Sequence, residues 1–275
     1  KLSLGAGDNQ VDVRGSMSNA ITTGLGNDII NVQSGDNIIR AGDGENVIRV
    51  VSLGTQNIVT GAGNDSIELN SGNIILNSGA GNDNIVINQS STSSNNSINL
   101  GDGDDFIEIN AVVGSSTING SIGNDQFIIH NNSVKLNDGG GNNIIHLDNS
   151  AISDDINTIN LGLGDDQVTV ISNGKTTIKT SNGDNVLNLS GTGSFNVTAG
   201  TGVDNIASGA GNDILNSGAG NDTINGNAGD DRLIAGAGND TLSGGIGNDV
   251  LEGGTDDDSY AGRKLNKKIC GLFSK

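Results

Sequence analysis

Seven aspartates recur at every ninth residue near the C-terminal end of the chain, and they are the residues best suited to chemistry. They are Asp204, Asp213, Asp222, Asp231, Asp240, Asp249 and Asp258. Each stands sixth in a nonapeptide with the pattern G-G-x-G-x-D-x-U-x, in which U is a large apolar residue. Six to eight oxygen ligands, from carboxylates and backbone carbonyls, favour calcium over zinc. The spacing therefore places a row of hard oxygen ligands between Ala199 and Ala261.

Glycines surround these aspartates, and the pattern gives them a role in the same sites. A glycine allows left-handed backbone and close approach of another chain segment. We therefore include these glycines in the predicted metal site: Gly200, Gly202, Gly209, Gly211, Gly218, Gly220, Gly229, Gly236, Gly238, Gly245 and Gly247. The last nonapeptide departs from the pattern, because Asp256 stands where the fourth-position glycine belongs. We interpret this nonapeptide as a degenerate cap.

The nonapeptide array resembles the RTX, or hemolysin-type calcium-binding, repeat family, whose members form a parallel β-roll. The resemblance implies that calcium lies between successive stacked turns, held by aspartate side chains and backbone carbonyls. In such an array the turns alternate between two sides, so that repeats 1, 3, 5 and 7 stack on one side and repeats 2, 4 and 6 on the other. That arrangement allows up to five sites between the turns of this array.

A longer and looser repeat fills the rest of the chain. Its anchor is the second glycine of each G-x-G, at steps of 18 to 23 residues: Gly7, Gly26, Gly44, Gly63, Gly81, Gly103, Gly123, Gly141, Gly164, Gly183 and Gly202. Two residues after the anchor, six coils before the array carry an aspartate, and we predict calcium ligands at Asp28, Asp65, Asp83, Asp105, Asp125 and Asp166. Four coils carry Asn9, Asn46, Asn143 and Asn185 there instead. Because an amide has no charge, we expect the sites beside them to be weaker or empty.

Apolar residues keep fixed distances from every anchor. An apolar residue stands five residues before and four after each one, as Ile58 and Ile67 do around Gly63, and in the longer coils another stands six after, as Leu69 does. A spacing of two is typical of a β-strand, and no segment keeps a helical period. The predicted fold class is all-β: a right-handed parallel β-solenoid, or β-roll, with stacked calcium-binding turns. Insertions such as Gln89–Asn96 and Asn149–Asp155 fall in the second turn of a coil and leave the strands undisturbed.

The repeat lengths predict three parts of the chain. Residues 1–198 form a solenoid of about ten coils of 18–23 residues, and residues 199–261 form a nonapeptide β-roll continuous with it. Residues 262–275 form a basic tail outside the repeat, which is either a frayed terminus or part of an export signal. The tail contains Cys270, the single cysteine, so a disulfide framework is excluded.

Charge and composition limit the partners. The formal net charge is −19, with 32 acidic and 13 basic residues, and such a surface repels nucleic acid and anionic membrane but attracts cations. No run of about 20 apolar residues exists, so no membrane span is expected. Stacking carboxylates about 4.8 Å apart is repulsive, and calcium would relieve that repulsion, so folding and calcium binding should be coupled.

These residues also allow interpretations other than calcium binding. Aspartate and asparagine can close turns by local hydrogen bonds without any metal. The two histidines, His130 and His146, stand at different offsets from their anchors and are expected on solvent-facing strand positions rather than in a zinc site. Paired carboxylates recur with the repeat, which indicates turn chemistry rather than a catalytic pair. No catalytic constellation is found, so we predict that the protein is not an enzyme.

The function predicted from these observations is that of a bacterial, secreted or cell-surface, calcium-binding structural protein that folds on binding calcium. An adhesin stalk, a surface-layer component and a filament component are the roles considered. Its expected partners are calcium ions and neighbouring copies or cell-surface components. The alternative is a C-terminal export and folding module of a larger secreted enzyme or toxin. Ice binding is less well supported, because the residues between the paired glycines form no regular threonine row.

Overall fold

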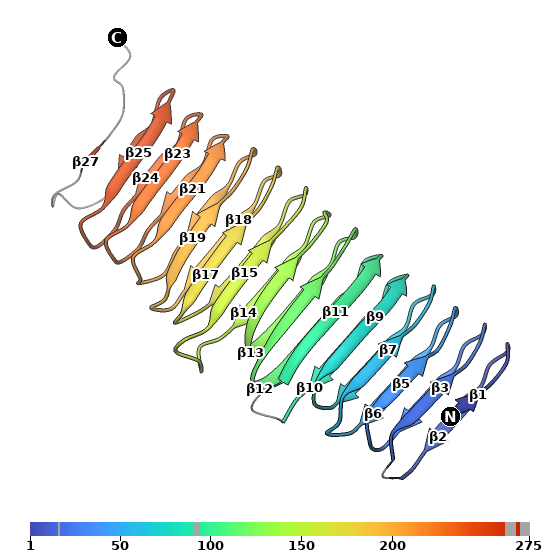
Figure 1. The fold of residues 1–275 in the computed structure, drawn as a ribbon. Helices are drawn as coiled ribbons and strands as arrows, with labels where there is room; N and C mark the ends of the chain where they lie inside the picture. Colours follow the sequence, from blue (N-terminus) through green and yellow to red (C-terminus); the bar gives the residue numbers. More distant parts are fainter. Residues whose placement is uncertain (16, 91–93, 262–267, 270–275) are drawn as a thin grey trace. The chain divides into compact units, whose positions relative to one another are not determined.

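The computed structural model describes residues 1–15, 17–90, 94–261 and 268–269. The chain divides into two compact units, Lys1–Gly139 and Gly140–Lys275, which we call unit 1 and unit 2. Both are built from β-strands and turns (Figure 1), and no helix that could cross a membrane occurs in the described parts of the chain. The predicted tail, except for residues 268–269, and Cys270 lie outside the described residues.

Unit 1 consists of strands that pair in parallel with the strand two further along the chain, as a solenoid requires. They are β1 (Leu2–Ser3), β2 (Gln10–Val13), β3 (Asn19–Thr22), β4 (Ile29–Val32), β5 (Asn37–Arg40), β6 (Val47–Val51), β7 (Gln56–Val59), β8 (Ser66–Asn70), β9 (Ile74–Ala80), β10 (Asn84–Asn88), β11 (Ser94–Asp102), β12 (Phe106–Asn119) and β13 (Gln126–Asn137). Even-numbered strands up to β12 line one face of the coil, and odd-numbered strands up to β11 line the other. The long strands β12 and β13 pass from one face to the other.

Unit 2 continues the same parallel pairing. Its strands are β14 (Ile144–Asp148), β15 (Ile156–Asn160), β16 (Gln167–Ile171), β17 (Lys175–Lys179), β18 (Val186–Ser190), β19 (Ser194–Thr198), β20 (Asn205–Ala207), β21 (Ile214–Ala219), β22 (Thr223–Asn225), β23 (Arg232–Ala237), β24 (Thr241–Ser243), β25 (Val250–Thr255), β26 (Ser259–Ala261) and β27 (Lys268–Ile269). The change from long coils to nonapeptides lies inside this unit. There β18 and β19 of the last long coil pair with β20 and β21 of the nonapeptide segment. The insertion Asn149–Asp155 connects β14 to β15, as predicted.

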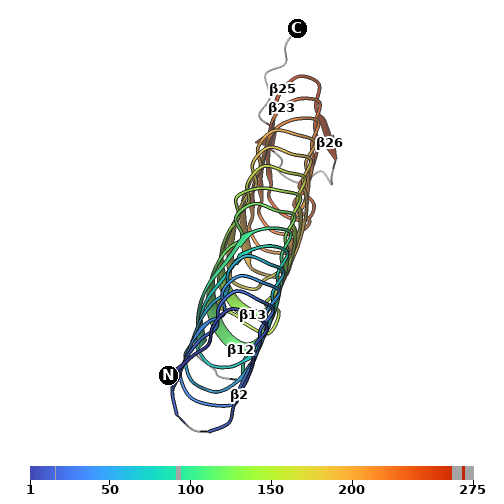
Figure 2. The same ribbon diagram turned by 90° about the vertical axis from the view of Figure 1, so that its right-hand side faces the viewer.

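The core of each unit is a narrow space between the two faces of the coil, visible in Figure 2 as the inside of stacked flattened loops. The apolar residues four positions after the anchors align in register, so that Ile48, Ile67 and Ile85 form one row with at most 1% exposure. The residues five positions before the anchors, such as Ile58 and Leu76, form a second buried row. The predicted all-β solenoid is thereby confirmed.

The turns that contain the anchor glycines stack as closely as the strands. All eleven anchors have a φ between +105° and +155°, a conformation that favours glycine. The N–H of an anchor donates to a carbonyl one residue before the anchor of the next coil, as from Gly63 to Ala80 (2.7 Å) and from Gly183 to Thr201 (2.8 Å). The backbone of each turn is therefore joined directly to the next turn.

Truncating one core side chain tests this architecture. Leu69→Ala should lower the free energy of unfolding by about 2–5 kcal/mol, because Leu69 is fully buried and a thin core cannot refill the cavity. The measurement is urea unfolding followed by circular dichroism in millimolar calcium. Ile75→Ala serves as the control, since Ile75 is 49% exposed on β9 and its loss should have a much smaller effect. Equal losses would contradict the assigned core.

Candidate metal centre

Each coil has a first turn, which contains the anchor glycine at position 4 of the nonapeptide pattern, and a second turn on the opposite side. The aspartates predicted as ligands stand at position 6 of first turns throughout the chain. Asp213, Asp231 and Asp249 stand at position 6 of second turns within the array. Every one of these position-6 aspartates is at most 2% exposed, apart from Asp258 in the last nonapeptide, which is half-buried.

The position-6 side chains form ladders along the turns. One carboxylate oxygen, Oδ1, accepts a hydrogen bond from the backbone N–H of position 6 in the preceding coil, as from Asp83 to Asp105 (2.8 Å) and from Asp204 to Asp222 (2.8 Å). The same bond joins Asp213 to Asp231 on the second turns (2.9 Å). Within each unit the structure therefore brings the predicted residues together as columns.

The second carboxylate oxygen, Oδ2, has a different environment. It is buried and accepts no hydrogen bond in a set of aspartates that spans both units: Asp28, Asp65, Asp83, Asp105, Asp166, Asp204, Asp213, Asp222, Asp231, Asp240 and Asp249. Buried polar atoms are almost always satisfied, and an unsatisfied carboxylate oxygen is costly. A column of such oxygens is what a hard cation would complete.

Hydroxyl groups near some of these carboxylates do not satisfy them. Ser78 lies beside Asp83, but its hydroxyl donates to the carbonyl oxygen of Leu100 (2.7 Å). Ser208 lies beside Asp213, and its hydroxyl donates to the carbonyl oxygen of Gly226 (2.9 Å). A hydroxyl has one proton, so neither group can also donate to the carboxylate.

Burial raises the pKa of several of these carboxyl groups. Removal from water is the largest cause, and it raises the pKa of Asp105 and Asp231 to about 7. It raises the pKa of Asp83, Asp166 and Asp240 to about 6, while backbone hydrogen bonds act in the opposite direction. Neighbouring carboxylates add to the rise, as Asp83 and Asp125 do for Asp105. A bound cation would remove this penalty on the charged form.

The glycines of the array leave the space that the carboxylates fill. A Cβ atom on Gly244 would overlap Oδ2 of Asp249, and one on Gly226 would overlap Oδ2 of Asp231. Of the predicted glycines, Gly202, Gly218, Gly220, Gly229, Gly236, Gly238, Gly245 and Gly247 have a positive φ. Gly200, Gly209 and Gly211 serve the other expected role, close approach, because a Cβ atom there would meet a backbone oxygen of the preceding coil. Asp256 keeps the turn conformation with a φ of +80°.

These residues fit a calcium ion better than a soft metal. In the portion of the chain that the structure describes, no group of three or more His, Cys, Asp or Glu side chains is placed to hold a metal ion. The donors available at each turn are a buried carboxylate and the carbonyl oxygens of a glycine-rich turn. An all-oxygen set of this kind suits calcium.

A second ladder, at position 5, was not recognised in the sequence. Its side chains are exposed and bond in the other direction: Oδ1 accepts from the backbone N–H of position 5 in the next coil. Oδ1 of Asn82 accepts a hydrogen bond from the N–H of Asp104 (3.0 Å), and Oδ1 of Asp165 accepts one from the N–H of Asp184 (2.8 Å). The recurrence of Asn and Asp directly before position 6 was the available signal, and it explains the repeated doublets without a catalytic role.

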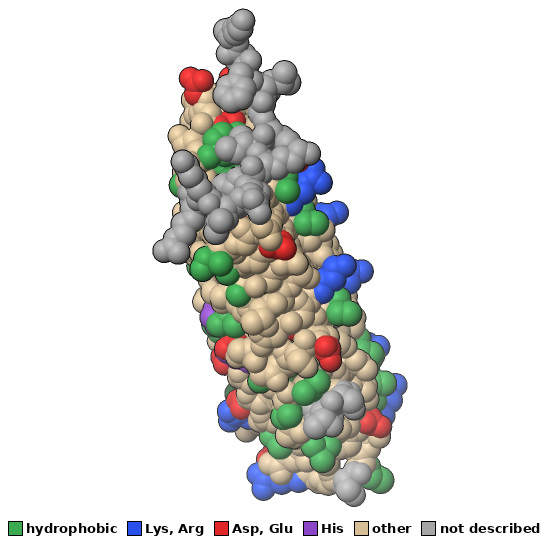
Figure 3. All heavy atoms as spheres, turned by 90° about the vertical axis from the view of Figure 1, so that its left-hand side faces the viewer, with side chains coloured by type: hydrophobic (Ala, Val, Ile, Leu, Met, Phe, Trp, Pro, Cys, Tyr) green, Lys and Arg blue, Asp and Glu red, His purple; other side chains and the backbone are tan. Residues whose placement is uncertain are grey.

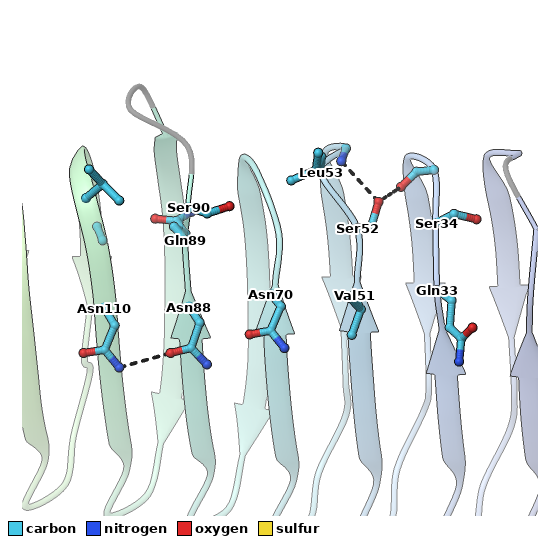
Figure 4. Close-up of a pocket in the computed structure, with 14 residues that line it drawn as sticks. Gln33, Ser34, Val51, Ser52, Leu53, Asn70, Asn88, Gln89, Ser90 and Asn110 are labelled. Carbon is cyan, nitrogen blue, oxygen red and sulfur yellow. Dashed lines mark hydrogen bonds between the residues drawn. The ribbon is translucent and has the colours of Figure 1, made fainter.

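The second turns of the longer coils have neither the motif nor the carboxylate column. A shallow groove of about 860 Å³ runs along them in unit 1 (Figure 4), lined only by uncharged residues. Asn70, Asn88 and Asn110 lie in a row on its successive strands, and Asn110 donates to Asn88 (3.1 Å). The groove contains none of the predicted ligands. His130 and His146 lie on β13 and β14 at positions that alternate with buried residues, as expected.

Stacked parallel coils with buried carboxylates in glycine-rich turns define the class as a metal-binding β-solenoid. The family model described as the RTX calcium-binding nonapeptide repeat (4 copies) matches residues 15–49, 52–85, 91–108, 198–233 and 225–260. Since these matches cover more than half of the chain, the protein belongs to this family, and the metal that its repeats bind is calcium. Neither a curated protein nor a solved structure matches the chain.

A glycine substitution tests how closely the turns stack. Gly238→Ala should lower the free energy of unfolding by at least about 1–3 kcal/mol, because Gly238 has a φ of +129° and its Cβ atom would overlap the carbonyl oxygen of Gly220. Ala237→Gly is the matched control, since Ala237 is exposed next to it. Chemical unfolding in millimolar calcium gives both values, and a harmless Gly238→Ala would contradict the stacking.

The raised pKa values predict an inverted response to pH. In the calcium-free protein, a raised carboxyl pKa gives stability that is fully present below about pH 4 and is lost as pH rises through 6 to 7. Lowering the pH from 8 to 5.5 in chelator should therefore shift the chain toward the folded state, as measured by circular dichroism. With calcium present, protons compete for the same carboxylates, so the calcium concentration needed to fill the sites should rise over the same range. A folded fraction in chelator that does not change between pH 8 and 5.5 would contradict the burial of these groups.

Proposed function

We propose that this protein is a secreted or cell-surface calcium-binding structural protein, of bacterial origin, whose coils fold when calcium enters the turns. The observation that carries the proposal is the column of buried position-6 carboxylates whose Oδ2 atoms have no hydrogen-bond partner. Each unit contains such a column, so calcium would act along the whole length of each unit rather than at one local site.

The position-6 aspartates and the carbonyl oxygens of their turns would hold the ion. Calcium would supply positive charge between carboxylates that otherwise repel each other. The chain itself does the positioning: the N–H groups of the preceding coil fix Oδ1, as Asp222 does for Asp240 (2.8 Å). In the folded turn each carboxylate is thereby held in a fixed orientation, and the turn glycines leave room for it.

The calcium affinity of such sites determines where the chain would fold, inside or outside a cell. Metal binding that completes a fold contributes its free energy to folding. Calcium sites of extracellular modules have dissociation constants of roughly 10⁻⁴–10⁻³ M, far above the free calcium concentration of a cytosol. Such a chain would stay unfolded inside a cell and fold outside it, which suits a protein that is exported.

The surface favours a structural role over a catalytic one. Figure 3 shows a face on which most atoms belong neither to hydrophobic nor to charged side chains. Among the residues that the structure describes, thirteen aspartates are buried, so much of the negative charge lies inside the turns rather than on a binding face. Together with the repetition of one coil, this supports a stalk, surface-layer or filament component.

Calcium-dependent folding is the direct test. In chelator near pH 7.5 the chain should be expanded, and at about 5 mM calcium it should be compact and rich in β-structure. Circular dichroism and small-angle X-ray scattering report the two states. Magnesium at the same concentration is the control and should not replace calcium, because it gives up its water reluctantly. Equal compaction in chelator and in calcium would contradict the proposal.

A further inference from the structure

The four first turns with asparagine at position 6 contain a hydrogen-bond arrangement that the aspartate turns lack. Asn46 Nδ2 donates to the carbonyl oxygens of Gly42 (3.1 Å) and Gly44 (3.0 Å) in its own turn. The same nitrogen donates to Oδ1 of Asp65 in the next coil (2.9 Å). One amide group therefore joins two carbonyl oxygens to the following carboxylate.

The other three asparagines repeat this arrangement in both units. Asn9 Nδ2 donates to Gly5 (3.1 Å), to Gly7 (2.6 Å) and to Asp28 (2.8 Å). Asn143 Nδ2 donates to Gly141 and to Asp166, both at 3.0 Å. Asn185 Nδ2 donates to Gly183 (2.9 Å) and to Asp204 (2.8 Å). The arrangement is therefore a property of asparagine at this position.

Aspartate and asparagine have the same shape, so Oδ2 of an aspartate takes the place of this nitrogen. The same carbonyl and carboxylate oxygens then surround an acceptor instead of a donor. In agreement, Oδ2 has no hydrogen-bond partner in Asp28, Asp83 or Asp105, among others. An aspartate turn needs a cation to connect these oxygens, whereas an asparagine turn already has N–H groups that do so.

Second turns in unit 1 show the same arrangement without any carboxylate. Asn37 Nδ2 donates to the carbonyl oxygen of Gly35, two residues before it (2.9 Å), and to Oε1 of Gln56 in the next coil (2.8 Å). Asn19 donates likewise to Met17 (2.9 Å) and to Asn37 (2.8 Å). In this column of the second turns, amide side chains take the place of the carboxylates.

We infer that Asn9, Asn46, Asn143 and Asn185 are substitutes for calcium: the N–H groups of each amide satisfy the oxygens that an ion would otherwise connect, and they keep the ion out of the space between that turn and the next coil. The inference rests on the proposed function, because it assumes that calcium fills the aspartate turns. It divides the spaces between successive first turns, which we call gaps, into those that need calcium and those that do not.

The order of these residues is the same in both units. Along the first turns of unit 1 they are Asn9, Asp28, Asn46, Asp65, Asp83, Asp105 and Asp125. Along those of unit 2 they are Asn143, Asp166, Asn185, Asp204, Asp222, Asp240 and Asp258. Each unit therefore begins with coils partly closed by amides and ends with four successive carboxylates. The first coils of each unit would need the least calcium and would fix the register for the rest.

A crystal structure grown in calcium, with the ions located by anomalous scattering, tests the inference directly. Calcium should occupy the gap between Asp83 and Asp105 and be missing between Asn46 and Asp65. Ions in both gaps would overturn the inference while leaving the proposed function intact. No ion in any turn would overturn the proposed function.

Two opposite substitutions give a second test in solution. Asn185→Asp should add one bound calcium per chain and lower the melting temperature in chelator, since it replaces a donor by a buried charge. Its matched control is Asn188→Asp, which adds the same charge at an exposed position three residues away and should change neither value. Asp83→Asn should remove one bound calcium and raise the melting temperature in chelator by several degrees.

The second substitution keeps the inference testable if Asn185→Asp does not fold. Equilibrium dialysis at saturating calcium counts the ions, and circular dichroism gives the melting temperatures. If the chain is unfolded in chelator, the calcium concentration at half-folding replaces the melting temperature, and Asp83→Asn should lower it. If Asp83→Asn destabilises the calcium-free chain, or if its calcium count stays unchanged, the amide does not replace the ion and the inference is wrong.

Discussion

The structure depends on the cost of burying a column of carboxylates in turns that stack at the spacing of β-strands. A position-6 aspartate such as Asp222 satisfies one oxygen through the backbone of the preceding coil and leaves the other without a partner. A thin core of single apolar rows offers little to offset this cost. Calcium and asparagine amides are two solutions to the same problem, and the chain uses both.

Much of this could be predicted from the sequence, because the relevant signals recur at fixed spacing. The apolar residues around each anchor gave the strands and their register, since a row such as Ile48, Ile67 and Ile85 must face the same side of successive coils. The anchor glycines marked the turns because their backbone conformation excludes most other residues. The position-6 aspartates were found because their chemistry and spacing both point to calcium.

The rest depended on which neighbour a side chain contacts, and spacing does not contain that information. Position 5 looked variable, although its side chains bond forward while those of position 6 bond backward. The second-turn amides do keep a fixed offset, since Asn37 and Gln56 each stand seven residues before an anchor, but that spacing does not show that the two side chains bond to each other. The sequence also did not show which glycines serve close packing rather than turn conformation, as Gly209 and Gly211 do.

The two opposed ladders have a consequence for how such a chain can change in length. In a first turn, the side-chain hydrogen bonds between two coils come from positions 5 and 6 of those coils, as between Asn82, Asp83 and their counterparts Asp104 and Asp105. Gain or loss of one whole coil therefore leaves every other junction unaltered, whereas a single-residue insertion in a first turn would break both ladders at once. Whole coils are the natural unit of insertion and deletion for this protein, and smaller changes are confined to the second turns.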